Sequence, residues 1–182
     1  MGSDKTAVAA TPLTADVVVE AAGRIIEQGG VDALTMRRLS DDLGVAVTSI
    51  YWHVGNRQAL LDAVVDRVLA DIGMLQAMGE TPRERVASLA RQLRIKMLER
   101  PHLIALVHAQ AKTPLMFRPV HAAMAAELDA LGQRGATAAL ALRALQMHVA
   151  GFVLLELAGE PSRDPDRVEL FEFGLEALLA AL

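Results

Sequence analysis

The chain has 182 residues, 53% of them hydrophobic, and a formal net charge of -4 at pH 7. This apolar content excludes disorder for most of the chain, and the length suffices for one continuous body or for a small domain joined to a larger one. The chain contains no cysteine, so disulfides, thiolate metal sites and cysteine nucleophiles are excluded. Its acidic balance argues against a protein that coats nucleic acid nonspecifically, because such binding needs many cations to neutralise phosphates.

Helical periodicity, interrupted by Gly and Pro, runs through nearly the whole chain, and no segment keeps a two-residue alternation. We therefore predict an all-α fold. Thr14 can cap a first helix that ends at Gly29-Gly30. Residues 1–13 are expected to be disordered or derived from a tag. They lack the basic and apolar segments of an export signal, so we expect a cytoplasmic protein.

Residues 34–61 carry the pattern of two short helices joined by a tight turn. Thr35 can cap the first of these helices, and Gly44 stands where a left-handed residue would end it. The second helix opens at Val47 or Thr48 and has one apolar edge that can be buried. This arrangement is typical of a helix-turn-helix.

The other edge of the second helix is polar and aromatic. Hydroxyl groups, an imidazole and aromatic rings suit phosphates, base edges and thymine methyls better than a dry core. A recognition helix is built in this way, so we predict that residues 14–55 form a helix-turn-helix DNA-binding domain. Packing of the aromatic rings beside the turn is the alternative. The side chains of this edge are Thr48, Ser49, Tyr51, Trp52 and His53.

Residues 30–69 resemble the TetR family of one-component bacterial repressors, and the run Tyr51-Trp52-His53-Val54 resembles the tetracycline-repressor subgroup. The resemblance implies an N-terminal three-helix DNA-binding domain, followed by a helical domain that binds an effector and dimerises. It also implies that Arg37 reaches a base in the major groove. Val47 departs from the subgroup, where a polar base-reading residue is usual, so we expect a different operator. The candidate DNA-binding residues are Thr35, Arg37, Val47, Thr48, Ser49, Tyr51, Trp52, His53 and Arg57.

Asn56 can cap a connecting helix that runs to about Leu75 within residues 56–79. Arg57 follows the start of this helix, where free amide groups attract anions, so we expect it to bind a phosphate. Thr81-Pro82-Arg83-Glu84 has the spacing of a capping box and opens a helix that ends near residue 100. Residues 80–182 are predicted to bind the effector and to dimerise, with further helices over residues 102–111, 115–131, 136–157 and 166–182.

The predicted helices over residues 136–157 and 166–182 are too apolar to bury only one face. We expect them to form half of a four-helix interface in a homodimer, with Ala150 and Gly151 pointing outward. A central helix pair in a monomer is the alternative. No membrane span is expected, because the longest apolar run, within residues 147–157, is shorter than the ~20 residues that a bilayer requires.

The sequence contains no catalytic triad, glycine-rich phosphate loop or general acid and base pair, so no catalytic residue is assigned and an enzyme is not expected. The histidines outside the helix-turn-helix are never three or four residues apart. This spacing argues against a metal site, and we expect no cofactor. His108 lies in the region where tetracycline repressors carry a magnesium-linked histidine, but its flanking residues do not match.

Residues 82–157 are rich in Met, Leu and Phe, which fill cores and also suit pockets for apolar ligands, and Gln110 is among their few polar groups. With the resemblance, this predicts a ligand-responsive transcriptional repressor. It would bind a palindromic double-stranded DNA operator as a homodimer and be released by a small apolar or aromatic effector. The alternatives are an all-α ligand carrier or enzyme that retains the fold, and a constitutive DNA-binding protein. The candidate effector-binding residues are Met97, His108, Phe117, His121, Gln146, Met147 and Phe152.

Overall fold

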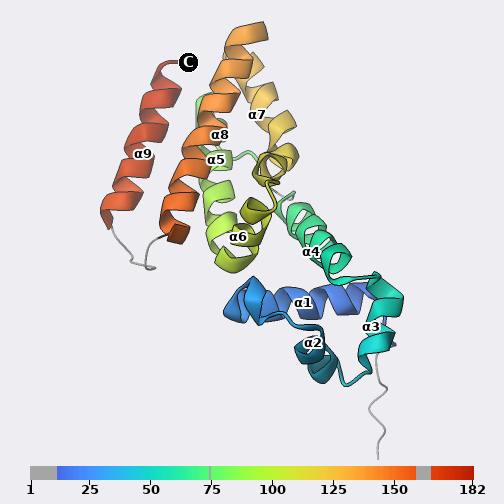
Figure 1. Ribbon diagram of the computed structural model, residues 1–182. Helices are drawn as coiled ribbons and strands as arrows, with labels where there is room; N and C mark the ends of the chain where they lie inside the picture. The colour runs from blue at the N-terminus through green and yellow to red at the C-terminus, as the bar shows by residue number, and fades with distance from the viewer. Residues whose placement is uncertain (1–11, 74, 159–164) are drawn as a thin grey trace, which may run out of the picture.

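The computed structural model describes residues 12–73, 75–158 and 165–182. These residues form nine α-helices and two short 3-10 helices, and no strand occurs among them (Figure 1). The predicted all-α fold is confirmed. Residues 1–11, most of the segment expected to be disordered or tag-derived, lie outside the described residues.

The N-terminal helices form a small unit, here called the head, at one end of the molecule (Figure 1). It consists of α1 (Ala15–Gly29), η1 (Val31–Ala33), α2 (Met36–Leu43) and α3 (Val47–Val54). The hydroxyl oxygens of Thr14 and Thr35 accept hydrogen bonds from the N–H groups of Val17 and Arg38, so both predicted caps are confirmed. Gly44 has a φ of 66°, the left-handed conformation that was expected to end α2. The short helix η1 was not predicted.

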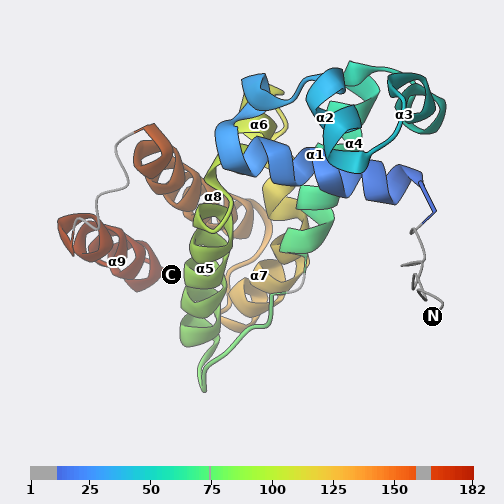
Figure 2. The ribbon, with the colours of Figure 1, turned by 90° about the horizontal axis from the view of Figure 1, so that it is seen from below.

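Helix α4 (Arg57–Ile72) connects the head to the rest of the chain. The Asn56 side chain caps it by accepting a hydrogen bond from the Ala59 N–H at 2.9 Å, as predicted. The helix ends at Ile72, before the expected end near Leu75. It contacts α1 and α3 in the head and also α5, α6 and α7, so it links the two parts of the molecule (Figure 2).

The remaining helices form what we call the body. They are α5 (Pro82–Leu98), α6 (Pro101–Ala109), η2 (Thr113–Phe117), α7 (Arg118–Ala130), α8 (Gly135–Ala158) and α9 (Pro165–Ala180). The capping box at Thr81 and Glu84 is present. A single helix over residues 115–131 was wrong: η2 and α7 replace it. Pro119 has no N–H to donate to the Leu115 carbonyl, so a continuous α-helix would lose a bond there, whereas the first turn of α7 needs none.

Helix α5 lies in the middle of the body and packs against α6, α7, α8 and α9. Two partly buried ion pairs tie the outer helices to it. Arg94 Nη2 lies 2.7 Å from Glu156 Oε1 of α8, and Arg91 Nη2 lies 2.6 Å from Glu172 Oε2 of α9. The Arg94 guanidinium also stands 4.8 Å from the centre of the Phe171 ring. These contacts hold α8 and α9 as one layer on the outside of the body.

One helix among the described residues, α8, is long and apolar enough to cross a membrane by length and composition alone. The sequence-based estimate counted only the run at residues 147–157 and therefore understated this length. In the structure α8 packs against α5, α7 and α9, yet only 28% of its most apolar 18-residue stretch is buried. Most of this apolar surface is therefore open to a covering partner.

Candidate nucleic-acid interface

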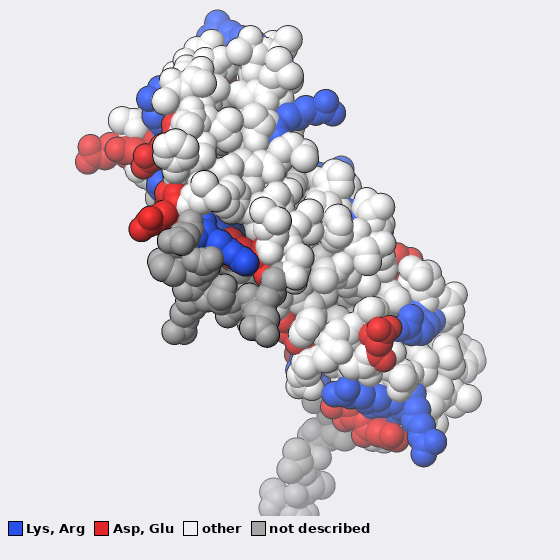
Figure 3. Space-filling view, turned by 60° about the vertical axis from the view of Figure 1, so that its left-hand side comes forward, with Lys and Arg blue, Asp and Glu red and all other residues white. Residues whose placement is uncertain are grey.

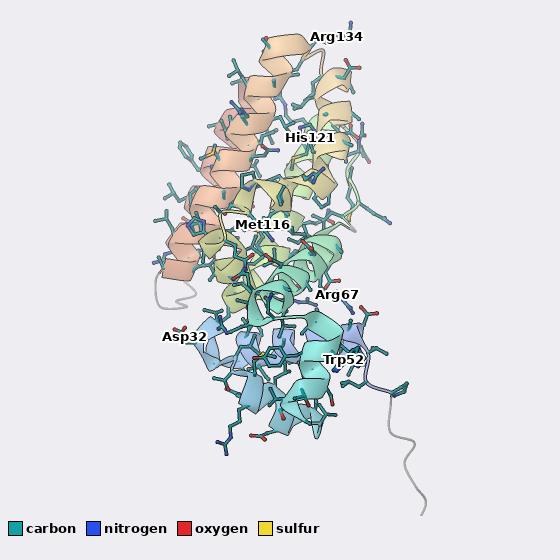
Figure 4. The ribbon with its side chains drawn as sticks, turned by 45° about the vertical axis from the view of Figure 1, so that its right-hand side comes forward. Asp32, Trp52, Arg67, Met116, His121 and Arg134 are labelled. Carbon is teal, nitrogen blue, oxygen red and sulfur yellow. The ribbon has the colours of Figure 1, made fainter. Side chains whose placement is uncertain are left out.

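Helix α3 presents one buried edge and one exposed edge. Ile50 is fully buried in the head and Val54 is partly buried, as the apolar spacing predicted. The opposite edge points to solvent, and the Trp52 side chain is 90% exposed (Figure 4). A tryptophan this exposed does not pack beside the turn, so the alternative interpretation of the aromatic run is excluded for Trp52.

The other predicted residues of α3 are distributed around this edge. Thr48, Tyr51 and His53 are exposed, whereas Val47 and Ser49 are partly buried. The exposed set carries a hydroxyl, a phenol, an indole N–H and an imidazole. This set can both donate and accept hydrogen bonds, as contact with base edges and phosphates requires.

The α2 helix, which packs against α3, carries an exposed cation. Arg37 is exposed and has no hydrogen bond or ion pair with any residue that the structure describes. Its neighbour Arg38 donates to Gln28 Oε1 at 3.5 Å, and the hydroxyl of Thr35 is used to cap the helix. Figure 3 shows Lys and Arg side chains close to Asp and Glu at the head. Arg37 therefore presents a guanidinium to solvent in a region of mixed charge.

The angle between α2 and α3 is set by a short turn that the chain closes with its own groups. Ser40 Oγ donates a hydrogen bond to the Val45 carbonyl at 2.5 Å, and the Val45 side chain is partly buried under the turn. With the left-handed Gly44, this bond orients α3 relative to α2. The exposed edge of α3 is thus oriented by the backbone geometry of the turn.

Arg57 has a role that the sequence did not predict. Its Nη2 donates to the carbonyl oxygens of Val31 and Leu34 at 3.2 and 3.4 Å, which braces η1 against the start of α4. The side chain remains exposed, so contact with a phosphate stays a prediction. The carbonyl partners lie 23 and 26 residues earlier in the chain, and no local pattern could have indicated them.

The candidate effector residues of the body lie at very different depths. Met97 and Phe117 are buried, and Gln146 and Phe152 are partly buried. The rest, His108, His121 and Met147, are exposed, and Met147 is 71% exposed. The structure does not gather the seven residues at one depth, and their role as a binding set stays a prediction.

Two further polar groups of the body bear on ligand binding. His108 Nδ1 lies 3.0 Å from the Thr113 hydroxyl, and no cluster of three His, Asp or Glu that could hold a metal ion occurs in the part of the chain that the structure describes. Gln110, at the end of α6, has its amide nitrogen and oxygen buried without a hydrogen-bond partner among the described residues. Buried amides are nearly always paired, so this group is able to bind a ligand's polar atoms. In the sequence, the only sign of this role for Gln110 was that it is a polar residue in an apolar region.

The fold and the exposed edge of α3 are those of a helix-turn-helix unit. Residues 18–64 match the family described as bacterial regulatory proteins, tetR family. The chain is 34% identical over 94 residues to an HTH-type transcriptional regulator of Saccharopolyspora erythraea, an alignment that covers 52% of this chain and 40% of that protein. Residues 18–64 therefore carry a DNA-binding domain of the TetR type.

Its DNA-binding region is similar to that of tetracycline repressors. It is 43% identical over 61 residues to the class A tetracycline repressor from transposon 1721 of Escherichia coli, covering 34% of this chain and 28% of the repressor. Each of these alignments spans less than half of the relative's own length. Over nearly the whole chain, a crystal structure of BioQ with its natural double-stranded DNA operator is similar in fold. It has a TM-score of 0.66 and 29% identity and covers 93% of this chain and 99% of BioQ.

Proposed function

We propose that the chain is a cytoplasmic, ligand-responsive repressor that binds a palindromic operator as a homodimer. The observation that carries the proposal is the exposed edge of α3, where Trp52 is 90% exposed, together with Arg37 of the adjoining α2, which is exposed and pairs with no residue that the structure describes. Exposed aromatic and cationic groups on a helix that follows a tight turn match how recognition helices enter the major groove. The relatives support it, because they are named as regulators and repressors.

The dimer is supported by the uncovered surface of α8 and α9. Large apolar side chains stand exposed along one edge of each helix, and Figure 3 shows a broad area of the body without charged side chains. Monomeric proteins rarely leave such a patch uncovered, so a second copy would bury it. The side chains are Leu140, Met147 and Leu155 of α8, and Leu170 and Phe173 of α9, each between 58% and 72% exposed.

The effector is proposed to be a small apolar or aromatic molecule bound within residues 82–157, without a required magnesium ion. Gln110 supports this, because its buried amide has no partner among the described residues, and such an amide costs roughly 1–3 kcal/mol that a ligand's donor or acceptor would recover. Binding that favours a dimer with wrongly spaced heads would weaken operator binding, and by linkage DNA would weaken effector binding equally. A constitutive DNA-binding protein is the second candidate, and an effector that releases DNA would exclude it.

The experiment is a fluorescence anisotropy titration of the palindromic DNA upstream of the gene. Arg37→Ala should weaken operator binding by ~1–3 kcal/mol and relax base preference at one position of each half-site. Arg118→Ala is the matched control, because Arg118 is also exposed and has no partner among the described residues but lies in the body. An equal loss on all DNA sequences would reduce Arg37 to a phosphate contact, and no loss at all would contradict the proposed interface.

A further inference from the structure

A groove of about 420 Å³ lies where the head meets the body. Its walls come from α1 of the head, from α4, and from the start of α6 in the body, and Figure 2 shows these helices meeting. The apolar part of the lining consists of Val19, Val64, Val68 and Leu103. This volume is in the range of small-molecule sites, and most of the residues that line the groove lie outside residues 82–157, the region proposed above for the effector.

Gly23 lines this groove from the middle of α1. A Cβ atom built at Gly23 would meet no atom within 4 Å, so neighbouring side chains do not require a glycine there. Glycine inside a helix is less favourable than alanine because it gains backbone freedom on unfolding. The chain therefore keeps a costly residue whose visible effect is to leave the groove open.

Some charged side chains at the rim of the groove are held by close ion pairs or hydrogen bonds. Arg100 Nη1 lies 2.7 Å from Asp71 Oδ2, a close pair. The Glu27 carboxylate accepts from the Leu103 N–H at 3.3 Å, and its carbonyl contacts His102 Nδ1 at 2.7 Å, so Glu27 is held between α1 and α6. These groups close one end of the groove.

Arg24 and Arg67 are held much more loosely. Arg24 lies 3.5 Å from Glu20 and 3.3 Å from Asp42, and Arg67 lies 3.9 Å from Asp16, whose side chain is 92% exposed. Such long, solvated pairs contribute little, so both guanidinium groups can exchange partners at small cost. Figure 4 shows Arg67 on α4 above α1.

We propose that this groove binds a small amphipathic carboxylate. Its carboxylate would bind the guanidinium groups of Arg24 and Arg67, which match carboxylates by shape and charge, and its hydrocarbon part would cover the valines and Leu103. Because the ligand would contact α1, α4 and α6 together, it fixes the head relative to the body. Operator affinity therefore depends on its presence.

The binding test uses isothermal titration calorimetry on the full chain with three probes. Octanoate carries both the charge and the tail, acetate the charge alone, and octylammonium the tail with the opposite charge. Saturable one-to-one binding of octanoate, with much weaker binding of the other two, is expected. Equal or tighter binding of octylammonium would overturn the carboxylate assignment, because Glu20 and Glu27 at the rim would then be the binding groups.

Variants locate the bound octanoate. The double variant Arg24→Gln with Arg67→Gln should raise its Kd by about tenfold or more, and Gly23→Leu should do the same by filling the groove. Arg118→Gln is the control and should leave the Kd unchanged. Gly23→Ala should raise the Tm without ligand, which shows that the position tolerates a side chain. An unchanged octanoate Kd in Gly23→Leu would place the ligand elsewhere and overturn the site.

The coupling between octanoate binding and operator binding is measured as the operator Kd with and without octanoate. The wild type should change its operator Kd at saturating octanoate, and Gly23→Leu should not. Binding without any change in operator Kd would overturn the regulatory part of the inference. Calorimetry needs no DNA, so the groove is tested even if the chain proves to bind no operator.

Discussion

Arg57 shows how one side chain can serve both the fold and a proposed contact. Its guanidinium holds the carbonyls of Val31 and Leu34 while remaining exposed at the start of α4. Arg57→Ala should therefore lower the free energy of unfolding by about 1 kcal/mol, because two carbonyls lose their donor. It should also weaken DNA binding uniformly across sequences and flatten the salt dependence by about one unit per chain.

Urea denaturation and anisotropy at several salt concentrations measure the two effects separately. Arg118→Ala, in the body, should change neither. A loss of DNA affinity with unchanged stability would assign Arg57 to phosphate alone. A loss of stability with unchanged DNA affinity would mean that Arg57 only stabilises η1.

At the scale of the element, the start of α5 carries a charge that folding favours. The pKa of Glu84 lies below its usual 4.5, first because the carboxylate accepts a hydrogen bond from the Thr81 N–H and next from the Glu80 N–H. This stabilisation is present above the unfolded-state pKa and is lost as the pH falls through the lower folded-state pKa. Glu84→Ala should therefore be less stable than the wild type at pH 7, with a difference that shrinks below about pH 4.5.

Thermal denaturation at a series of pH values checks this prediction, and an NMR titration of Glu84 gives the direction of its pKa directly. Glu80→Ala is the control, because the structure uses the backbone of Glu80 in this motif and not its side chain. A stability difference that stays constant down to pH 3 would show that the carboxylate charge is not what stabilises the cap.

The contact between α8 and α9 depends on a second helical glycine. A Cβ on Gly174 would lie 2.5 Å from His148 Cε1. That ring cannot move away easily, since its Nε2 donates to the Phe171 carbonyl at 2.9 Å and it stacks on the Phe171 ring. Gly174→Ala should therefore destabilise the fold by ~1–3 kcal/mol, as overpacked cores do.

Gly23→Ala is the matched comparison, because the same added methyl meets nothing there and should stabilise the fold by roughly 0.5–1 kcal/mol. Urea denaturation measures whether each variant raises or lowers the free energy of unfolding. Stabilisation by both substitutions would mean that α9 shifts freely on α8 and is not held by the ring of His148.

At the scale of the whole molecule, the apolar layer of α8 and α9 is predicted to bind a second copy. Phe173 is 72% exposed and lies on this face. Phe173→Glu should convert the dimer into monomers at micromolar concentration, because an unpaired charge is not tolerated in an apolar interface. Gly151, which is exposed, suits the same test, whereas Ala150 is buried against the chain and was wrongly expected to point outward.

Sedimentation velocity measures the change in oligomeric state. Ala122→Glu places the same charge on an exposed position of α7 and should leave the dimer intact. A monomeric wild type would contradict the interface. A dimer that survives Phe173→Glu would move the interface to another surface.

The sequence by itself determined the features that depend on neighbouring residues. Helix starts at Thr14, Thr35 and Asn56 and the turn at Gly44 follow from hydrogen bonds or backbone angles within a few residues, so local patterns predicted them. The exposed edge of α3 followed from helical spacing and the resemblance to tetracycline repressors. The break at Pro119 was also local, and its missing donor could have indicated it.

Only the tertiary structure decided the features that join distant segments. Three examples depend on which helices pack together: the carbonyl partners of Arg57, the side of α8 on which Ala150 lies, and the buried amide of Gln110, which has no hydrogen-bond partner among the described residues. The groove at Gly23 requires α1, α4 and α6 to meet. Helical periodicity states which faces are apolar but not which face meets which neighbour, because many helix pairs can bury similar apolar area.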